Sequence, residues 1–293
     1  MFNFKKAELS DSQELSDSLS KYRDRICDYS AGNVIFWRDY YGISFHLDGE
    51  CLILKYYNMG KKVCFSYPVS EQPIEIIKKL LKQEGSPLCL CCLTEKQLEE
   101  VKANFNVCEV IHSEDWDDYL YLAEDIITLH GRRYNGQRNH INKFKKCSPE
   151  HSFEIITNEN TALAKEFCRN YFDNLKKDSR VFDTERVQLI EMLDNWDRYH
   201  QHGGLLLVEN QPVGISVGEV VGDTLIVHVE KAYTSYEGAY PMLTNCFARE
   251  FATGEECHYI NREEDCGEEG LRLAKKSYHP IEIIKKYGVV ITE

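Results

Sequence analysis

GGLLLVENQPVGISVGEVVGDTLIVHVEKA, residues 203–232, is the stretch that organises the second half of the chain. Its runs 203–210, 213–221 and 224–232 are rich in Val, Ile and Leu, and the dipeptide Gly222-Asp223 separates the last two. Short runs of this kind, bounded by turn residues, are typical of antiparallel strands joined by tight turns. The stretch therefore predicts a β-meander.

The segments around this meander alternate between strand and helix patterns. We expect strands at 153–157 and 257–263, helices at 161–175, 184–202, 238–252 and 267–278, and a final segment that ends the chain. Two helices, a meander, and then helix, strand, helix and strand is an order similar to that of the GNAT acyltransferase fold. The second half is therefore expected to be a GNAT-like domain.

Residues 1 to about 112 follow a similar order without a visible sequence repeat. Ser10 or Asp11, with Glu14 in the next turn, is a typical cap for a helix over 11–30. Turns at 48–49 and 58–61 predict a second antiparallel meander over 42–69. The remaining elements are a helix at 73–85, a strand at 87–93, a helix at 94–105 and a strand at 106–113. The predicted fold class is α/β with mixed sheets, in two tandem GNAT-like domains.

A sharp change in charge marks the expected domain junction. Residues 113–125 hold six acids and no base, and residues 131–146, GRRYNGQRNHINKFKK, hold six Arg or Lys and no acid. Charge runs of opposite sign favour a boundary here. We expect an N-terminal domain at 1–125 and a C-terminal domain at 126–293 that carries a basic helix at 136–146.

Net charge limits the partners. The formal charge is -13, and the basic stretch contributes +6, so the other 277 residues carry -19. A field of this sign repels nucleic acid and anionic membranes over most of the surface, but a local patch acts within a Debye length of about 8 Å. The basic stretch is therefore predicted to be a site for a phosphorylated ligand, with tRNA and coenzyme A as candidates.

Composition and motifs exclude several classes of protein. With 43% hydrophobic and 28% charged residues the chain is typical of globular proteins. It begins without the apolar run of a secretory signal and holds no apolar stretch of about 18 residues, so we expect a cytoplasmic protein without stable membrane insertion. Walker, G-x-S-x-G, H-E-x-x-H and G-x-G-x-x-G motifs are absent from the sequence.

The twelve cysteines are expected to be reduced core thiols. Cys89, Cys92, Cys108 and His112 have roughly the spacing of a structural zinc site. However, residues three apart on a strand point to opposite faces. We therefore assign no metal.

The basic helix has an ordered surface. Arg138, Asn142 and Lys145 share one face, and Ile141 with Phe144 form a narrow apolar anchor. Amides interleaved with cations suit a phosphate, because amides fix hydrogen-bond geometry while Arg and Lys supply charge. The ligand-binding candidates here are Arg132, Arg138, Asn139, Asn142 and Lys145. The alternative is an internal strut that pairs with the preceding acids.

The strand at 225–230 offers the first catalytic candidates. Strict alternation puts Ile226, His228 and Glu230 on one face. Either ionisable residue is a candidate general base for an attacking amine or hydroxyl. The alternative for each is a structural role at the strand.

Two later segments add candidates. Ser235, Gly238 and Ala239 lie where GNAT proteins hold the pyrophosphate of coenzyme A, although SYEGAY departs from that motif and Pro241 removes a donor. Asn261, Glu263 and Asp265 leave a strand together and are candidate substrate ligands. The alternative for Glu263, Glu264 and Asp265 is that these acids cap the next helix and favour its dipole. Tyr278 is the candidate general acid.

Two motifs, DYLYLAEDIITLHGRRYNGQRNHINKFKK at 118–146 and YINREEDCGEEGLRLAKKSYHP at 259–280, resemble bacterial proteins grouped with the C-terminal domain of phosphatidylglycerol lysyltransferases. The resemblance covers nearly the whole chain and implies a tandem GNAT fold, similar also to Fem-type aminoacyl transferases. It implies an aminoacyl-tRNA donor and a phosphate-handling role for the basic helix. The large membrane domain of true lysyltransferases is absent from this sequence, which argues against a lipid acceptor.

The resemblance implies an acyl or aminoacyl transferase that uses aminoacyl-tRNA or acyl-coenzyme A and an amine or hydroxyl acceptor. The alternative is a non-catalytic module of the same fold that binds a nucleotide, RNA or another phosphorylated ligand through the basic helix.

Overall fold

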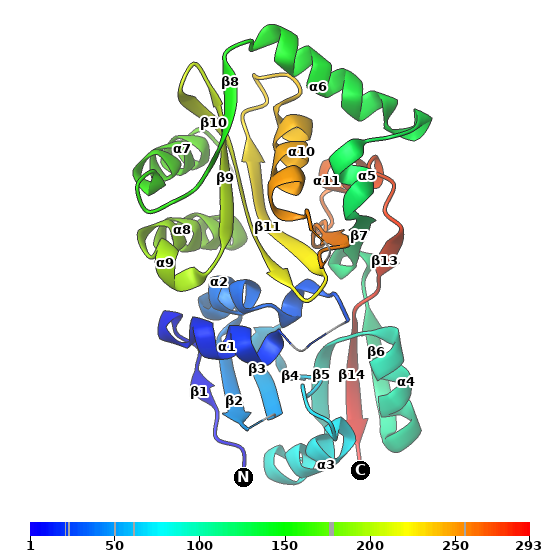
Figure 1. Ribbon diagram of the computed structural model, residues 1–293. Helices are drawn as coiled ribbons and strands as arrows, with labels where there is room; N and C mark the ends of the chain where they lie inside the picture. The colour runs from blue at the N-terminus through cyan, green and yellow to red at the C-terminus, as the bar shows by residue number, and fades with distance from the viewer. Residues whose placement is uncertain (21, 23, 50, 61, 176–178, 255) are drawn as a thin grey trace. The chain divides into compact units, whose positions relative to one another are not determined.

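The computed structural model describes residues 1–293 except 21, 23, 50, 61, 176–178 and 255. Residues 21 and 23 of the predicted helix 11–30, and residue 61 of the predicted turn 58–61, lie outside the described residues. The chain forms two compact units, and each is discontinuous in sequence (Figure 1). The first unit comprises 1–118, 264–269 and 283–293, and the second comprises 119–263 and 270–282.

The first unit is built on a seven-stranded mixed sheet. Its strand order is β1 (Lys5–Lys6), β2 (Ile43–Asp48), β3 (Cys51–Met59), β4 (Lys62–Ser66), β5 (Leu88–Leu93), β14 (Tyr287–Thr292) and β6 (Asn106–His112). Its helices are α1 (Ser12–Leu19), α2 (Ala31–Tyr41), α3 (Pro73–Glu84) and α4 (Glu95–Asn104). The predicted meander and the elements at 73–113 are confirmed.

Two features of this unit differ from the sequence-based expectation. The predicted helix 11–30 ends at Leu19 in α1, and a separate helix, α2, begins after Ser30, whose side chain accepts a hydrogen bond from the Asn33 amide. The last strand, β14, pairs antiparallel with both β5 and β6. The C-terminal residues therefore complete the sheet of the first unit, whereas the predicted domains 1–125 and 126–293 are contiguous.

The second unit contains a seven-stranded sheet in the order β13 (Glu282–Ile284), β7 (Asp118–Leu122), β12 (Tyr259–Asn261), β11 (Thr224–Ala232), β10 (Gln211–Val221), β9 (His202–Val208) and β8 (His151–Ile155). Strands β9 to β11 form the predicted antiparallel meander, β8 pairs antiparallel with β9, and β12 pairs parallel with β11. The predicted α/β class with mixed sheets is confirmed.

The helices of the second unit are α5 (Ala123–Thr128), α6 (Asn135–Cys147), α7 (Thr161–Asn174), α8 (Arg180–Asp194), α9 (Trp196–Tyr199), α10 (Ala239–Phe251) and α11 (Glu269–Lys276). Figure 1 shows α10 on one side of the sheet and α7 with α8 on the other. The predicted helix 184–202 is broken at Asn195, which separates α8 from α9.

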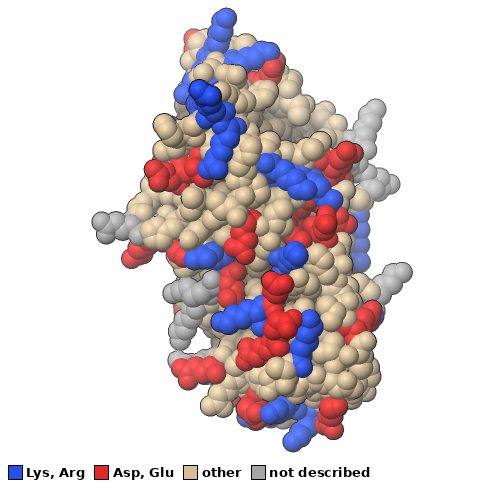
Figure 2. All heavy atoms as spheres, turned by 90° about the vertical axis from the view of Figure 1, so that its right-hand side faces the viewer, with Lys and Arg blue, Asp and Glu red and all other residues tan. Residues whose placement is uncertain are grey.

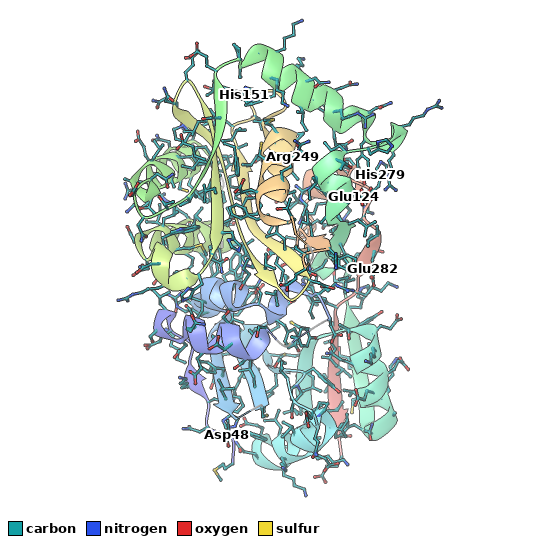
Figure 3. All side chains as sticks on the ribbon, in the orientation of Figure 1. Asp48, Glu124, His151, Arg249, His279 and Glu282 are labelled. Carbon is teal, nitrogen blue, oxygen red and sulfur yellow. The ribbon has the colours of Figure 1, made fainter. Side chains whose placement is uncertain are left out.

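Helix α10 anchors this core. Ala239, Leu243 and Phe247 repeat every four residues and are all buried, so one face of the helix packs on the sheet. The C-terminal end of α10 contacts α5, because Arg249 Nε donates a hydrogen bond to the Ile127 carbonyl at 3.2 Å. Arg249 is labelled in Figure 3. Among the described residues, no helix is both long and apolar enough to cross a membrane.

Candidate functional site

A β-bulge sets the direction of the candidate catalytic side chains on β11. Val217 pairs with Val229, but the next residue, Gly218, pairs with Val227, so His228 is an extra residue on β11. A bulge of this kind re-aims the side chains that follow it. We predicted that Ile226, His228 and Glu230 share one face of the strand. This prediction is wrong for Glu230, because the bulge interrupts the alternation at His228.

Glu230 consequently lies beside α10. One carboxylate oxygen accepts a hydrogen bond from the Thr244 hydroxyl on α10, and the other lies 3.0 Å from Arg262 Nη2. The pairing of β11 with β12 ends at Ile226 and Asn261, so Glu230 and Arg262 both lie beyond the paired part of the strands. Their side chains are 11% and 10% exposed, which makes this a largely buried ion pair.

Tyr278 completes this cluster. The Arg262 guanidinium lies over the Tyr278 ring, with 4.9 Å from Cζ to the ring centroid. Burial raises the pKa of Tyr278 to about 12, although the Arg262 charge opposes this effect. The hydroxyl therefore keeps its proton at neutral pH.

Two buried hydrogen-bond donors in the cluster lack acceptors. Within the described part of the chain, Arg262 Nη1 and the Tyr278 hydroxyl are buried and have no hydrogen-bond partner. An unpaired buried polar group costs about 1–3 kcal/mol, so such groups call for an explanation. The two unpartnered donors make this cluster the candidate active site.

His228 occupies a different environment. Its Nδ1 lies 2.7 Å from Glu263 Oε1 and its Nε2 lies 2.9 Å from Glu219 Oε1. Burial lowers the pKa of His228, but the two carboxylates outweigh burial and raise it to about 10. Because both ring nitrogens face carboxylates, the ring is a cation at neutral pH. General-base catalysis by His228 stays a prediction, and the geometry favours Glu230 for that role.

The predicted substrate ligands after β12 are engaged inside the protein. In the second unit, Asn261 Oδ1 accepts from the Glu263 amide at 2.6 Å, and Lys275 Nζ donates to the backbone carbonyls of Arg262 and Glu263. In the first unit, Asp265 Oδ1 accepts from the Gly267 amide at 2.9 Å. These contacts shape the chain around Arg262, and substrate binding by Asn261, Glu263 and Asp265 stays a prediction.

The predicted basic helix is confirmed as α6, and Ile141 and Phe144 are its buried anchor. Arg138 is held by its own loop: its guanidinium donates to the Leu129 and Gly131 carbonyls and to Asn135. Figure 2 shows acidic side chains close to basic ones on one face of the protein.

Other cations of the stretch differ in their surroundings. Lys143 Nζ pairs with Glu237 at 2.5 Å, and Arg133 pairs with Asp125 at 2.6 Å. Arg132, Asn139, Asn142, Lys145 and Lys146 are among the exposed residues of the stretch. The stretch therefore combines a strut, centred on Arg138, with an exposed face, and ligand binding by that face stays a prediction.

The start of α6 also fixes the position of Tyr278. The Tyr134 hydroxyl donates to the Tyr278 carbonyl at 3.2 Å, and Gln137 Nε2 donates to the Ser277 carbonyl at 2.6 Å. His279, labelled in Figure 3, lies with Nε2 3.1 Å from the Arg133 carbonyl. The basic helix and the Glu230 cluster are thus structurally linked.

The predicted coenzyme A loop is covered by α6. Gly238, the residue before α10, has φ +86, and a Cβ added there would lie 2.1 Å from the His140 carbonyl oxygen of α6. Ala239 is buried, whereas Ser235 is exposed. Backbone of α6 therefore occupies the space next to the α10 N-terminus in which a pyrophosphate would bind. Cofactor binding by Ser235, Gly238 and Ala239 stays a prediction that this geometry does not favour.

A second charged cluster, in the first unit, was not found by sequence reasoning. Lys286 Nζ lies 2.9 Å from Asp28 and from Asp118 and 3.3 Å from Glu264. Burial lowers the pKa of Lys286, but these carboxylates more than offset the effect and raise it well above its ordinary value. Asp28 and Lys286 are 258 positions apart, so no local pattern signals the cluster.

This cluster resembles a metal site but already holds a cation. Cys27, Asp118 and Glu264 offer ligand atoms within 4.8 Å of one another. Lys286 Nζ lies 3.5 Å from Cys27 Sγ as well as within 3.3 Å of both carboxylates. The ammonium group therefore takes the position that a metal ion would need.

A cavity of about 290 Å³ in the first unit adjoins this cluster. Asp28, Glu264 and Lys286 form its charged side, and Cys64, Cys89 and Cys92 are among the residues of its other walls. Cys89 and Cys92 therefore reach the same cavity, while His112 lies 3.0 Å from Asp117 and Cys108 lies 3.9 Å from Thr292 Oγ1. The residues with zinc-like spacing are not brought to one point.

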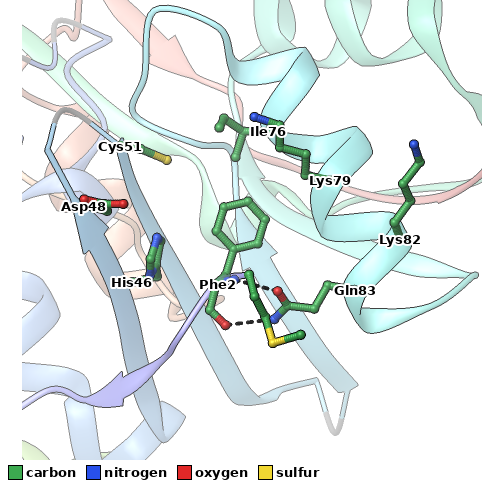
Figure 4. Close-up of a pocket in the computed structure, with 9 residues that line it drawn as sticks. Phe2, His46, Asp48, Cys51, Ile76, Lys79, Lys82 and Gln83 are labelled. Carbon is green, nitrogen blue, oxygen red and sulfur yellow. Dashed lines mark hydrogen bonds between the residues drawn. The ribbon is translucent and has the colours of Figure 1, made fainter.

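A wider hollow of about 580 Å³ lies beside the N-terminal segment (Figure 4). The Phe2 amide donates to Gln83 Oε1 and Gln83 Nε2 donates to the Phe2 carbonyl, so α3 holds this segment in place. The catalytic candidates lie elsewhere, and the charged groups around this hollow do not converge.

Comparisons with known proteins show which family and which structures this chain is similar to. A family model described as "Phosphatidylglycerol lysyltransferase, C-terminal" matches residues 20–290. A conserved protein of unknown function from Bacteroides thetaiotaomicron has a structure with a TM-score of 0.91, 30% identity and 100% coverage of both chains. An uncharacterised protein from Mycoplasmoides gallisepticum is 26% identical over 204 residues, which span 68% of this chain and 63% of that relative.

Two more distant structures share the fold. L-PGS from Bacillus licheniformis has a TM-score of 0.66 at 13% identity and covers 97% of this chain and 93% of its own. FemX has a TM-score of 0.60 at 10% identity and covers 94% and 95%. The expected tandem GNAT-like α/β fold is confirmed. Since the family model matches most of its length, the chain belongs to the phosphatidylglycerol lysyltransferase C-terminal family.

Proposed function

We propose that this protein is an aminoacyl transferase that moves an aminoacyl group from its ester on tRNA to an amine or hydroxyl acceptor. Membership of a lysyltransferase family supports the class of reaction. The observation that carries the proposal is the pair of unpartnered buried donors, Arg262 Nη1 and the Tyr278 hydroxyl, beside the Glu230 carboxylate.

The cluster offers a group for each step of ester aminolysis or transesterification. The acceptor nitrogen or oxygen attacks the ester carbonyl, and Glu230 takes the proton that the acceptor loses. Arg262 Nη1 donates a hydrogen bond to the oxyanion that forms on the carbonyl oxygen. When the bond to the ribose oxygen breaks, Tyr278 protonates that oxygen and regains a proton from Glu230. The acceptor's proton thus ends on Tyr278, and the proton that Tyr278 held ends on the released tRNA hydroxyl.

Aminoacyl-tRNA suits the site better than acyl-coenzyme A. The α10 N-terminus, which would hold a pyrophosphate, faces the His140 carbonyl. The exposed cations of α6 are available to tRNA phosphates, and Gln137 of α6 donates a hydrogen bond to the Ser277 carbonyl, next to Tyr278. Acyl-coenzyme A remains the second donor to be assayed.

The transfer chemistry is tested by replacing Tyr278 with Phe. Loss of one oxyanion or leaving-group donor is expected to lower kcat by about 10² to 10³. The unfolding midpoint should change little, because the hydroxyl has no partner to lose. The assay follows formation of aminoacyl hydroxamates from a panel of charged tRNAs with hydroxylamine as acceptor, against a reaction without protein.

The matched control is Tyr57→Phe, since Tyr57 is 46% exposed in the first unit. A Tyr278→Phe protein as active as this control would count against the mechanism. Binding of charged tRNA without turnover of any member of the panel would instead favour a non-catalytic binding module.

The role of α6 is tested by two sets of substitutions. Replacing exposed Lys145 and Lys146 by Ala should weaken tRNA binding and reduce the slope of log K against log salt by about 0.7–0.9 for each phosphate that the protein no longer neutralises. Replacing Arg138 by Ala should instead lower the free energy of unfolding by about 0.5–1.5 kcal/mol, because the hydrogen bonds to the Leu129 and Gly131 carbonyls are lost. Filter binding at several salt concentrations and urea denaturation distinguish these effects. Reversal of the two patterns would make Arg138 the ligand-binding residue.

A further inference from the structure

Two cysteine side chains meet across neighbouring strands of the first unit. Strands β4 and β5 run parallel, with Phe65 opposite Leu90 and Ser66 opposite Cys91. One position earlier on each strand stand Cys64 and Cys89, and their Sγ atoms lie 2.9 Å apart. Adjacent strands are spaced about 4.8 Å apart, within the range of about 4.4–6.8 Å between Cα atoms that a disulfide needs. The backbone is therefore already suited to a bond between the two sulfurs.

Both thiols line a cavity of the first unit. Cys64 and Cys89 line the cavity of about 290 Å³, together with Met59, Leu90 and Ile111. Cys89 is partly exposed, and Trp116 on the same cavity is 48% exposed. Cys64 itself is only 2% exposed, so a reagent must reach it through the cavity that both thiols line.

The electrostatic environment favours a thiolate on Cys64. The hydrogen bonds that Cys64 shares with Cys89 and Cys91 lower the pKa of Cys64, and the charge of Lys62 acts in the same direction, whereas burial opposes it. The pKa of Cys89 is raised, chiefly because its proton is shared with Cys64. A thiolate is the nucleophile in thiol–disulfide exchange, and a neighbouring thiol is the resolving group.

We propose that Cys64 and Cys89 form a reversible dithiol modification site that reacts with low-molecular-weight disulfides at this cavity. The Cys64 thiolate attacks one sulfur of the disulfide RSSR, so that a mixed disulfide forms and RS⁻ leaves with a proton as RSH. Cys89 loses its proton and attacks the Cys64 sulfur, which forms the Cys64–Cys89 bond and releases the second RSH. Cys64 releases its proton to solvent when it ionises, and the first RS⁻ takes up a proton from solvent. Counted from the dithiol, the protein loses two electrons and two protons, and RSSR is reduced to two thiols.

Oxidation of the two thiols would change the wall of this cavity. In the reduced form its wall carries two thiol groups, and in the oxidised form a covalent bond joins β4 to β5 at that wall. A small thiol regenerates the reduced form by the reverse exchange. The site is independent of the transfer chemistry proposed for the second unit.

The test treats the reduced full-length chain with glutathione disulfide, followed by alkylation and peptide mass mapping. A peptide pair linked through Cys64 and Cys89 is expected, and dithiothreitol should remove it. Cys64→Ser and Cys89→Ser should each abolish this pair. Cys108→Ser, which removes an exposed thiol on β6, should leave it unchanged. A linkage of Cys64 to Cys91, or glutathione on Cys108 without any linked pair, would overturn the proposal.

A second measurement needs no variant. Phenylarsine oxide bridges two adjacent thiols, so it should protect Cys64 and Cys89 of the wild-type chain from later alkylation. Prior treatment with glutathione disulfide should prevent this bridging, so that the mass added to the protein by phenylarsine oxide disappears. Protection of other cysteines, with Cys64 and Cys89 still alkylated, would place the reactive dithiol elsewhere and refute the assignment.

Discussion

Replacing Lys286 by Met is expected to lower the free energy of unfolding by about 3–5 kcal/mol, because it removes one partner from a buried ionic cluster. Lys286 is 7% exposed, and its ammonium lies within 3.3 Å of the carboxylates of Asp28, Asp118 and Glu264. Burial raises the pKa of Asp28, but Lys286 more than compensates and keeps it below its ordinary value. Without the ammonium, these carboxylates would lose their shared counter-ion in a poorly solvated site.

Urea denaturation of the full chain, followed by tryptophan fluorescence, measures this effect. Lys285→Met is the matched control, because it removes the same charge from the adjacent, exposed position. Surface substitutions of this kind change stability by about 0.5 kcal/mol or less. Equal midpoints for the two variants would show that the cluster contributes little to stability.

The free energy of unfolding is also expected to fall as pH rises from about 6.5 towards 10, by on the order of 3–5 kcal/mol from His228 alone. The folded state raises the pKa of His228 from 6.5 to about 10. Between these values the folded protein binds a proton that the unfolded chain releases, so the stabilisation is complete below 6.5 and is lost as pH approaches 10. His228 is 3% exposed, so solvent screens its ion pairs little.

A His228→Gln variant isolates this titration. It should be less stable than the wild type near pH 6.5 and should show a flatter dependence of unfolding free energy on pH. His140→Gln is the control, since His140 is exposed on α6. Parallel curves for wild type and His228→Gln would contradict a cationic His228 in the folded protein.

Local sequence patterns predict many of the elements of this fold. The meander over 203–232 and the helix over 136–146 are both found, since periods of two and 3.6 residues depend on neighbours only a few positions apart. The anchor formed by Ile141 and Phe144 follows from the same periodicity. Helix α2 was not predicted from the sequence. Its buried residues lie on most of its faces, so it lacks the alternation of apolar and polar faces that indicates an amphipathic helix.

The candidate site was only partly accessible from sequence. Glu230 and Tyr278 stand out as ionisable residues in motifs, but Arg262 and Thr244 do not, because a lone Arg in an acidic run and a lone Thr on a helix carry no pattern. The bulge at His228 changes which side chains share a face, and it arises from the pairing of β10 with β11 rather than from β11 alone. Alternation within one strand therefore misplaced Glu230 relative to His228.

The sequence by itself determined the family, the order of most strands and helices, and the location of the concentrated positive charge. Only the tertiary structure decided that Arg138 is held by its own loop, that α6 covers Gly238, and that Lys286 meets Asp28. Periodicity is set by a few covalent neighbours, whereas the partner of a buried charge is set by the packing of segments far apart in the chain.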